Sequence, residues 1–140
     1  MDEAQQKMGP TFIFAKRVYL VAAIYGFIVL VPQYFLEASL VPPTTHPEQF
    51  YGFIGLALVW QFVFVMISRD VGRYRMLMPV TVLEKLAFGL PALILYLQGR
   101  VLAPVLAVGL IDLLLGMLFA IAFVTTRGNQ NKMGTEPKLF

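Results

Sequence analysis

The sequence contains no cysteine and a single histidine, His46, and both scarcities limit the chemistry that the chain can support. Without cysteine there are no disulfides, no thiol catalysis and no iron–sulfur or zinc–thiolate sites. With one histidine and no cysteine, a metal site at His46 is not expected. The chain also lacks a Ser-His-Asp set, a phosphate-binding loop and a nucleotide fingerprint. The common hydrolytic, nucleotide-dependent and metal-dependent enzyme classes are therefore not indicated.

Charged residues are also scarce, at 14% of the 140 residues, whereas hydrophobic residues reach 59%. A soluble domain is closer to half apolar. The excess lies in four blocks of about 17 to 26 residues with few or no charges, which is the length that crosses a bilayer. A soluble core built from four such blocks would leave too little polar surface. The sequence therefore predicts an all-α integral membrane protein, a four-helix bundle without a soluble domain.

The four blocks divide the chain into a membrane domain and two tails. We expect an N-terminal tail over residues 1–17, in which Pro10 breaks any early helix. A transmembrane domain over residues 18–124 follows, and a flexible C-terminal tail covers residues 125–140. Within the domain the predicted helices span about residues 18–35, 50–68, 76–97 and 101–124. Pro91, inside the third of these helices, predicts a kink.

Positive residues gather on one side of the predicted membrane. The two tails and the turn between the second and third helices carry Lys7, Lys16, Arg17, Arg69, Arg73, Arg75, Arg127, Lys132 and Lys138. Only Arg100 falls in a loop on the other side. The positive-inside rule then places both termini in the cytoplasm, an N-in/C-in topology. This placement accounts for the net charge of +3 without a nucleic-acid partner.

Each predicted helix carries a polar side chain at a similar depth. At about 1.5 Å per residue from the cytoplasmic ends, Tyr25, Gln61, Glu84, Lys85 and Asp112 fall in one slab about 6 Å thick near the middle of the membrane. Ionisable groups at that depth are costly and need partners. Side chains of adjacent helical residues diverge by about 100°. We therefore expect Lys85 to face Asp112, and Glu84 to face Gln61 or Tyr25.

Two glycines, Gly109 and Gly116, share a face of the fourth predicted helix with Asp112. They would let another helix approach this carboxylate closely. Two carboxylates and one lysine leave one negative charge in excess. Because burial disfavours the charged form of a carboxyl group, we expect one of the two, Glu84 rather than Asp112, to be protonated or hydrogen-bonded at neutral pH.

Three interpretations of this polar layer stay open. It is a structural ion pair that joins the helices, the lining of a ligand pocket, or part of a proton or ion pathway. Trp60, beside Gln61 at mid-depth, is either core filler or a wall for a flat ligand. In a pocket, the predicted ligand-binding residues are Tyr25, Trp60, Gln61, Glu84, Lys85 and Asp112.

Several segments carry a resemblance to a known family. The run HPEQFYGF over residues 46–53, leading into LVWQ at 58–61, is followed by the basic turn over residues 68–75 and by LEK at 83–85. Over about half of the chain these segments resemble small bacterial DoxX-like membrane proteins. The resemblance implies a four-helix bundle in the bacterial inner (cytoplasmic) membrane, and links with quinone-dependent oxidoreductase complexes in some members.

A more distant architectural likeness is to the EXPERA group, four- or five-helix proteins that include sterol isomerases and sterol-binding receptors. In that group, acidic residues and aromatic side chains line a pocket within the bundle. By resemblance alone, a pocket in this chain would lie at Gln61, Glu84 and Asp112.

Three functions compete on these grounds. The first is binding of an apolar ligand with one polar group, such as a quinone, a sterol or another isoprenoid. The second is a membrane enzyme, an isomerase or oxidoreductase-associated protein, that uses Glu84 or Asp112 as a general acid or base. The third is an accessory subunit that packs in a larger membrane complex or a homo-oligomer, with membrane lipids as further partners. Because no complete catalytic set is present, we favour binding or an accessory role over catalysis.

A proton-coupled small transporter is a further alternative. Its usual membrane glutamate would lie in the first helix, which here has no acidic residue before Glu37.

Overall fold

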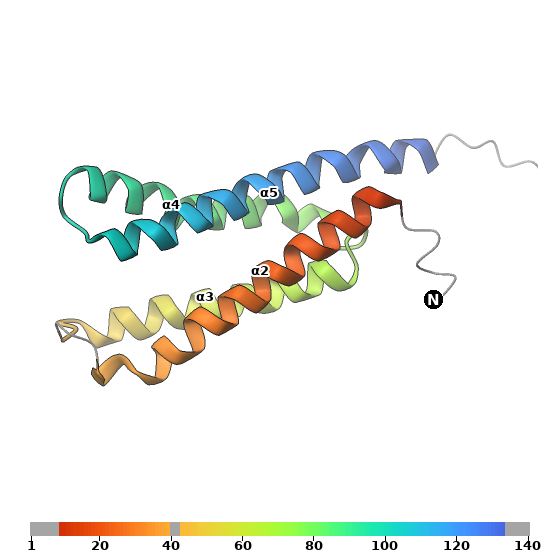
Figure 1. Ribbon diagram of the computed structural model, residues 1–140. Coiled ribbons are helices and arrows are strands. Elements are labelled where there is room, and N and C mark those ends of the chain that lie inside the picture. Colours follow the sequence, from red (N-terminus) through yellow and green to blue (C-terminus); the bar gives the residue numbers. More distant parts are fainter. Residues whose placement is uncertain (1–8, 40–42, 134–140) are drawn as a thin grey trace, which may run out of the picture.

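The computed structural model describes residues 9–39 and 43–133 and consists of four long helices (Figure 1). These helices are α2 (Pro10–Phe35), α3 (Pro47–Arg69), α4 (Met78–Leu97) and α5 (Ala103–Met133), and two short 3-10 turns, η1 (Glu37–Ser39) and η2 (Arg75–Leu77), adjoin them. All four helices contain a span that is long and apolar enough to cross a membrane. The predicted all-α membrane four-helix bundle is therefore confirmed, and the chain is a multi-pass membrane protein.

Prolines stand at the starts of α2, α3 and α4. Pro10, Pro47 and Pro79 occupy the first or second position of their helices. A proline there loses no hydrogen bond, because the first N–H groups of a helix have no partner within it. The helix begins at Pro10 rather than near residue 18, so residues 10–17 of the predicted N-terminal tail are helical. Whether Pro10 ends an earlier helix stays a prediction, because residues 1–8 lie outside the described residues.

The last helix is also longer than predicted. It continues to Met133 instead of ending near residue 124, so the first part of the predicted C-terminal tail is helical. Thr125 and Thr126 remain compatible with a helix because their hydroxyl groups donate to backbone carbonyl groups one turn back. Residues 1–8 and 134–140 of the predicted tails lie outside the described residues. α4 runs without interruption past Pro91.

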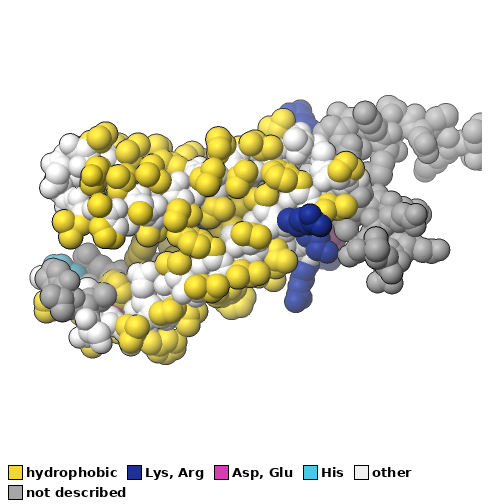
Figure 2. Space-filling model, viewed as in Figure 1, with side chains coloured by type: hydrophobic (Ala, Val, Ile, Leu, Met, Phe, Trp, Pro, Cys, Tyr) yellow, Lys and Arg dark blue, Asp and Glu magenta, His cyan; other side chains and the backbone are white. Residues whose placement is uncertain are grey.

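The four helices form two antiparallel hairpins. α2 packs along α3, α4 packs along α5, and the hairpins meet chiefly through α2 and α5. The start of α2 and the end of α5 lie at the same end of the bundle (Figure 1). We call this the basic end, because the exposed side chains of Arg17, Arg69, Arg73 and Arg127 surround it (Figure 2). At the opposite end, the loop end, the hairpins splay apart.

Glycines bring α4 and α5 into backbone contact. A Cβ on Gly89 would lie 3.0 Å from the Gly109 carbonyl oxygen, and a Cβ on Gly109 would lie 2.7 Å from the Cβ of Ala92. About two helical turns further along α5, a Cβ on Gly116 would lie 3.2 Å from the Cβ of Lys85. The prediction that Gly109 and Gly116 admit a neighbouring helix beside Asp112 is confirmed.

An aromatic core joins all four helices in the basic half of the bundle. The rings of Tyr19 and Phe119 stack at 4.2 Å between centroids, and Phe64 meets Phe119 edge-on at 5.1 Å. All three side chains are fully buried. The Tyr19 hydroxyl forms a 2.7 Å hydrogen bond with the hydroxyl of Thr81, which also donates to the Met78 carbonyl oxygen. This core holds the two hairpins together on one side of the polar layer.

At the basic end, Arg75 fastens the start of the α4 hairpin to α5. Its Nη2 donates to the Phe123 carbonyl oxygen at 3.0 Å, and its Nε donates to Thr126 Oγ1 at 3.3 Å. The guanidinium also lies 4.3 Å from the centre of the Phe123 ring. Arg75 therefore binds α5 within the chain and also adds positive charge at the basic end.

Candidate functional site

A cavity of about 910 Å³ lies between the two hairpins, on the loop-end side of the aromatic core. All four helices line it, and the surface is hollowed where the hairpins separate (Figure 2). Ligand pockets in proteins have volumes of roughly 300–1,000 Å³. The structure brings together in this cavity all the side chains that the sequence predicts for a pocket: Tyr25, Trp60, Gln61, Glu84, Lys85 and Asp112. Their role in binding a ligand stays a prediction.

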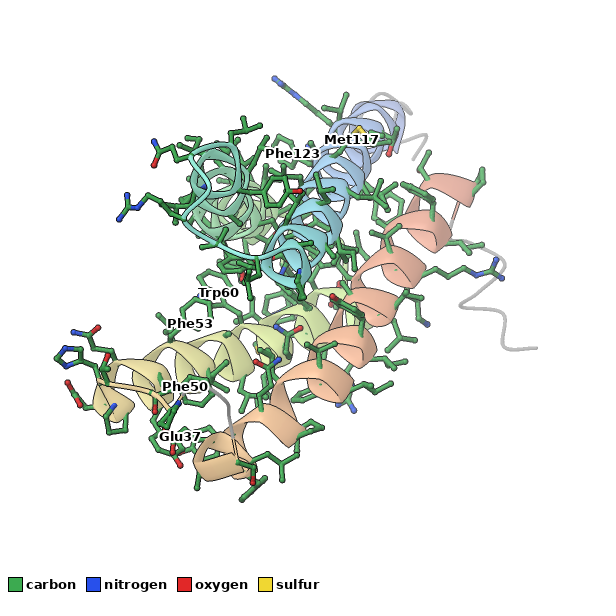
Figure 3. All side chains as sticks on the ribbon, turned by 60° about the vertical axis from the view of Figure 1, so that its left-hand side comes forward. Glu37, Phe50, Phe53, Trp60, Met117 and Phe123 are labelled. Carbon is green, nitrogen blue, oxygen red and sulfur yellow. The ribbon has the colours of Figure 1, made fainter. Side chains whose placement is uncertain are left out.

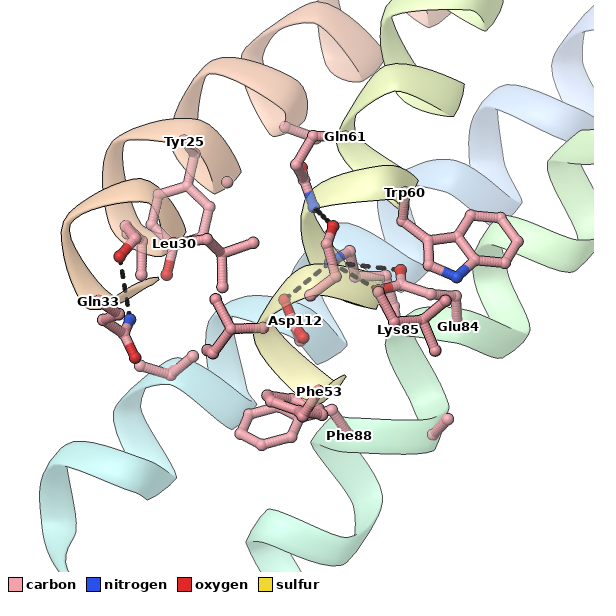
Figure 4. A pocket seen from close by; sticks show the side chains of 18 of the residues that line it. Tyr25, Leu30, Gln33, Phe53, Trp60, Gln61, Glu84, Lys85, Phe88 and Asp112 are labelled. Carbon is pink, nitrogen blue, oxygen red and sulfur yellow. Dashed lines mark hydrogen bonds and ion pairs between the residues drawn. The ribbon is translucent and has the colours of Figure 1, made fainter. Parts of the chain in front are cut away.

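Most of the cavity wall is apolar. Its apolar side chains are Ala22, Val29 and Leu30 of α2, Phe53, Ile54, Leu56 and Ala57 of α3, Val80, Leu83, Ala87 and Phe88 of α4, and Pro104, Val105 and Val108 of α5. Phe53 and Phe88 touch across the two hairpins, with 5.7 Å between ring centroids (Figure 4). The sequence did not single out either phenylalanine, because phenylalanines are common in membrane helices and periodicity does not reveal which ones meet.

A cluster of three charged side chains lies at the inner part of the cavity (Figure 4). Lys85 Nζ is 3.1 Å from Asp112 Oδ1, which confirms the predicted pairing of α4 with α5. The same ammonium is 3.3 Å from Glu84 Oε2. The expectation that Glu84 turns away from Lys85 toward Gln61 or Tyr25 is wrong. Residues 84 and 85 point in different directions from the helix, but the lysine side chain is long enough to reach Glu84. The Lys85 ammonium therefore lies between both carboxylates.

Gln61 enters the bundle against a glycine of the neighbouring helix. Its Nε2 donates to the Ala57 carbonyl oxygen at 2.8 Å, and the residue is only 2% exposed. Its Oε1 has no hydrogen-bond partner among the residues that the structure describes. A Cβ on Gly26 would overlap this oxygen, so only glycine leaves room for Gln61 there. The sequence pattern did not single out Gly26. Its place next to Tyr25 is a possible signal, because it puts this glycine at the depth of Gln61.

Two aromatic side chains flank the charged cluster. In the view of Figure 4, Tyr25 of α2 lies on one side of it and Trp60 of α3 on the other. Trp60 also contacts the aromatic core, with its ring centroid 6.5 Å from that of Phe64. It therefore packs against the core and also lines the cavity, and its role as a wall for a flat ligand stays a prediction. Gln33, which the sequence did not single out, adds a polar group nearer the loop end, and its Nε2 donates to the Val29 carbonyl oxygen at 3.0 Å.

Comparisons of the chain with protein-family models, with curated proteins and with solved structures give no match. The resemblance to DoxX-like and EXPERA proteins stays a prediction, and the functional argument rests on the geometry of the cavity.

The arrangement suits the binding of an amphipathic molecule. Its walls offer an apolar ligand a surface to pack against, and its polar groups converge at one place, as in most small-molecule sites. Within the described residues, no group of three His, Asp or Glu side chains is placed to hold a metal ion.

Proposed function

We propose that this membrane protein binds an apolar ligand with one polar group in the cavity between its two hairpins. The observation that carries the proposal is the coincidence of a cavity of about 910 Å³ with the only charged cluster inside the described part of the bundle. An ion pair that only joins two helices can be closely packed and needs no cavity beside it. Quinones, sterols and other isoprenoids are the ligand classes of this shape.

In the proposed complex the polar end of the ligand lies beside Lys85 and Asp112. The apolar body extends toward the loop end, along Phe53 and Phe88. Leu83, which lines the cavity, is also 63% exposed on the outer surface of the bundle. The cavity wall is thus continuous with the lipid-facing surface between α3 and α4, which gives an apolar ligand a path from the bilayer.

We also propose that the protein lies in a bacterial cytoplasmic membrane with its basic end inside. Exposed arginines surround that end, and Arg100 is the single described cation in the loops of the opposite end. Lysine and arginine in short loops stay on the cytoplasmic side during insertion.

An accessory subunit is the second candidate function. The lateral opening between α3 and α4 favours it, because a helix of a partner protein can cover an opening of this kind. Catalysis by Glu84 or Asp112 is not part of the proposal, because the sequence offers no complete catalytic set.

Solvent extraction of gently purified protein tests the proposal. We expect the wild-type protein to yield one apolar compound in a fixed ratio, and Asp112→Asn and Glu84→Gln to yield much less of it. Asp70→Asn and Glu48→Gln are the matched controls, because both residues are exposed and lie outside the cavity. A wild-type monomer that yields only bulk phospholipid would contradict the proposal, and co-purification of other membrane subunits would favour the accessory role.

A further inference from the structure

We propose that the polar end of the ligand is a hydrogen-bond donor, a hydroxyl or amine group, and that the free oxygen atom of Asp112, in the charged cluster, receives it. This inference rests on the proposed function, since it names the chemistry of the ligand in the same cavity. An acceptor-only group, such as a quinone carbonyl or an ether, and an anion, such as a phosphate, would find weaker partners there.

The first argument is that the strong donors of the cavity already bind acceptors of the chain itself. Lys85 is the single cation among the lining residues, and its ammonium contacts Asp112 Oδ1 at 3.1 Å and Glu84 Oε2 at 3.3 Å. The amide nitrogen atoms of Gln61 and Gln33 each donate one N–H group to a carbonyl group of their own helix. An incoming phosphate or carbonyl group would have only the N–H groups that remain.

The second argument is that acceptors are left over. A carboxylate has about four lone-pair sites on its two oxygen atoms. Asp112 accepts its hydrogen bond from Lys85 through Oδ1, and no described residue donates to its second oxygen. Glu84 Oε2 and Gln61 Oε1 also accept no hydrogen bond, but both atoms have almost no accessible surface, so the second oxygen of Asp112 is the acceptor that a ligand can reach. Buried acceptors without a donor are costly, so a ligand that supplies one gains affinity.

The third argument is the balance of charge. Two carboxylates surround one ammonium, so the ionised cluster carries one negative charge in excess. An excess of that sign repels phosphate and carboxylate groups and attracts a positively polarised hydrogen or a cation. Two weaker donors also line the cavity, the Trp60 indole N–H and the Tyr25 hydroxyl, but neither carries charge, and the tyrosine hydroxyl also accepts hydrogen bonds.

The chain offers a direct readout for this inference. Trp60 is its single tryptophan and lines the cavity, so the intrinsic fluorescence of the whole protein reports on this one place. We would measure that fluorescence with the protein in phosphatidylcholine nanodiscs. The probes are four molecules with one tail: farnesol, farnesylamine, farnesyl methyl ether and farnesyl phosphate.

We expect farnesol, farnesylamine or both to give a saturable shift of the Trp60 emission. The methyl ether should bind about tenfold more weakly than the alcohol, because one hydrogen bond is lost, and the phosphate more weakly still. Asp112→Asn should reduce the difference between alcohol and ether severalfold, and the exposed Asp70→Asn should leave it unchanged. Preference for the amine would indicate that both carboxylates are ionised, and preference for the alcohol would indicate a neutral cluster.

Two results would overturn the inference. If the ether or the phosphate binds as tightly as the alcohol, the cavity binds apolar molecules but does not select a donor, and the proposed function survives. If no probe gives a saturable shift while extraction of the purified protein yields an acceptor-only compound, the ligand class is wrong. If the protein binds no probe and yields no compound, the proposed function itself is contradicted. Circular dichroism of each variant establishes that it is folded.

Discussion

Lys85 of α4 and Asp112 of α5 meet at 3.1 Å inside the bundle, where the described helices enclose both charge and open volume. The contact is possible because Gly116 leaves room for the lysine stem and Gly109 lets the two helices approach. Figure 3 shows the side chains of both hairpins from a second direction. The same pair closes the wall of the cavity and presents polar atoms to it. Stability and binding are therefore linked at this contact.

The first prediction concerns the ion cluster. Lys85→Met removes the only cation of the cluster and leaves Glu84 and Asp112 without their partner. If both carboxylates stay ionised, the loss should destabilise the protein by about 3–5 kcal/mol. Adding Asp112→Leu to Lys85→Met should recover much of this loss, because one uncompensated charge is removed. Unfolding in mixed detergent micelles, followed by circular dichroism, measures the difference. A Lys85→Met protein as stable as the wild type would show that the cluster is not a paired unit.

The second prediction concerns helix contact at glycine. Gly109→Ala should destabilise the bundle by about 1–3 kcal/mol, because the new methyl group would collide with Ala92 across the α4–α5 contact. Gly52→Ala is the matched control. No atom lies within 4 Å of a Cβ at Gly52, so alanine should be neutral there or slightly stabilising in α3. Equal effects of the two substitutions in the same unfolding assay would contradict the packing described for α4 and α5.

The third prediction concerns the buried hydrogen bond between Tyr19 and Thr81. In a double-mutant cycle with Tyr19→Phe and Thr81→Val, we expect a coupling energy of about 0.6 kcal/mol, which is typical of hydrogen bonds between membrane helices. Each single variant should lose more stability than Tyr51→Phe, since Tyr51 lies near the loop end and is partly exposed. A coupling energy of zero would mean that the two hydroxyl groups do not depend on each other.

How far the sequence predicts this structure differs from feature to feature. The number of helices follows from the apolar blocks, because a membrane-spanning helix must be long and almost free of charge. The pairing of Lys85 with Asp112 follows from their similar depth and the short connection between α4 and α5. The helix ends do not follow, because Pro10 can either break a helix or begin one, and only the packing of the first turns decides.

The cavity itself lies beyond sequence reasoning. Its volume depends on the splay of one hairpin from the other, and that angle is set by contacts such as Tyr19 with Phe119 and Phe53 with Phe88. Nor does helical geometry alone predict the contact of Lys85 with Glu84, since it depends on how the long lysine side chain is extended. The sequence predicts the polar residues of the cavity, because they lie at a similar depth in the membrane. It does not predict the apolar residues around them.

The fourth prediction concerns topology, and it uses the absence of cysteine. Single cysteines at Gln98, in the turn at the loop end, and at Gly72, in the turn at the basic end, should differ in reactivity in intact bacterial cells. A membrane-impermeant thiol reagent should label Gln98→Cys from outside and should label Gly72→Cys only after the membrane is opened. The reverse pattern would place the basic end outside and contradict the positive-inside assignment.

The most direct test of the central claim is the mass of the protein as it leaves the membrane. Native mass spectrometry should find the wild-type chain with the added mass of one small molecule. Val108→Phe, which places a larger side chain in the cavity wall, should lose that mass, whereas Val59→Phe on the exposed face of α3 should retain it. If both variants and the wild type carry the same bound mass, or none of them carries any, the cavity between the hairpins is not a ligand site.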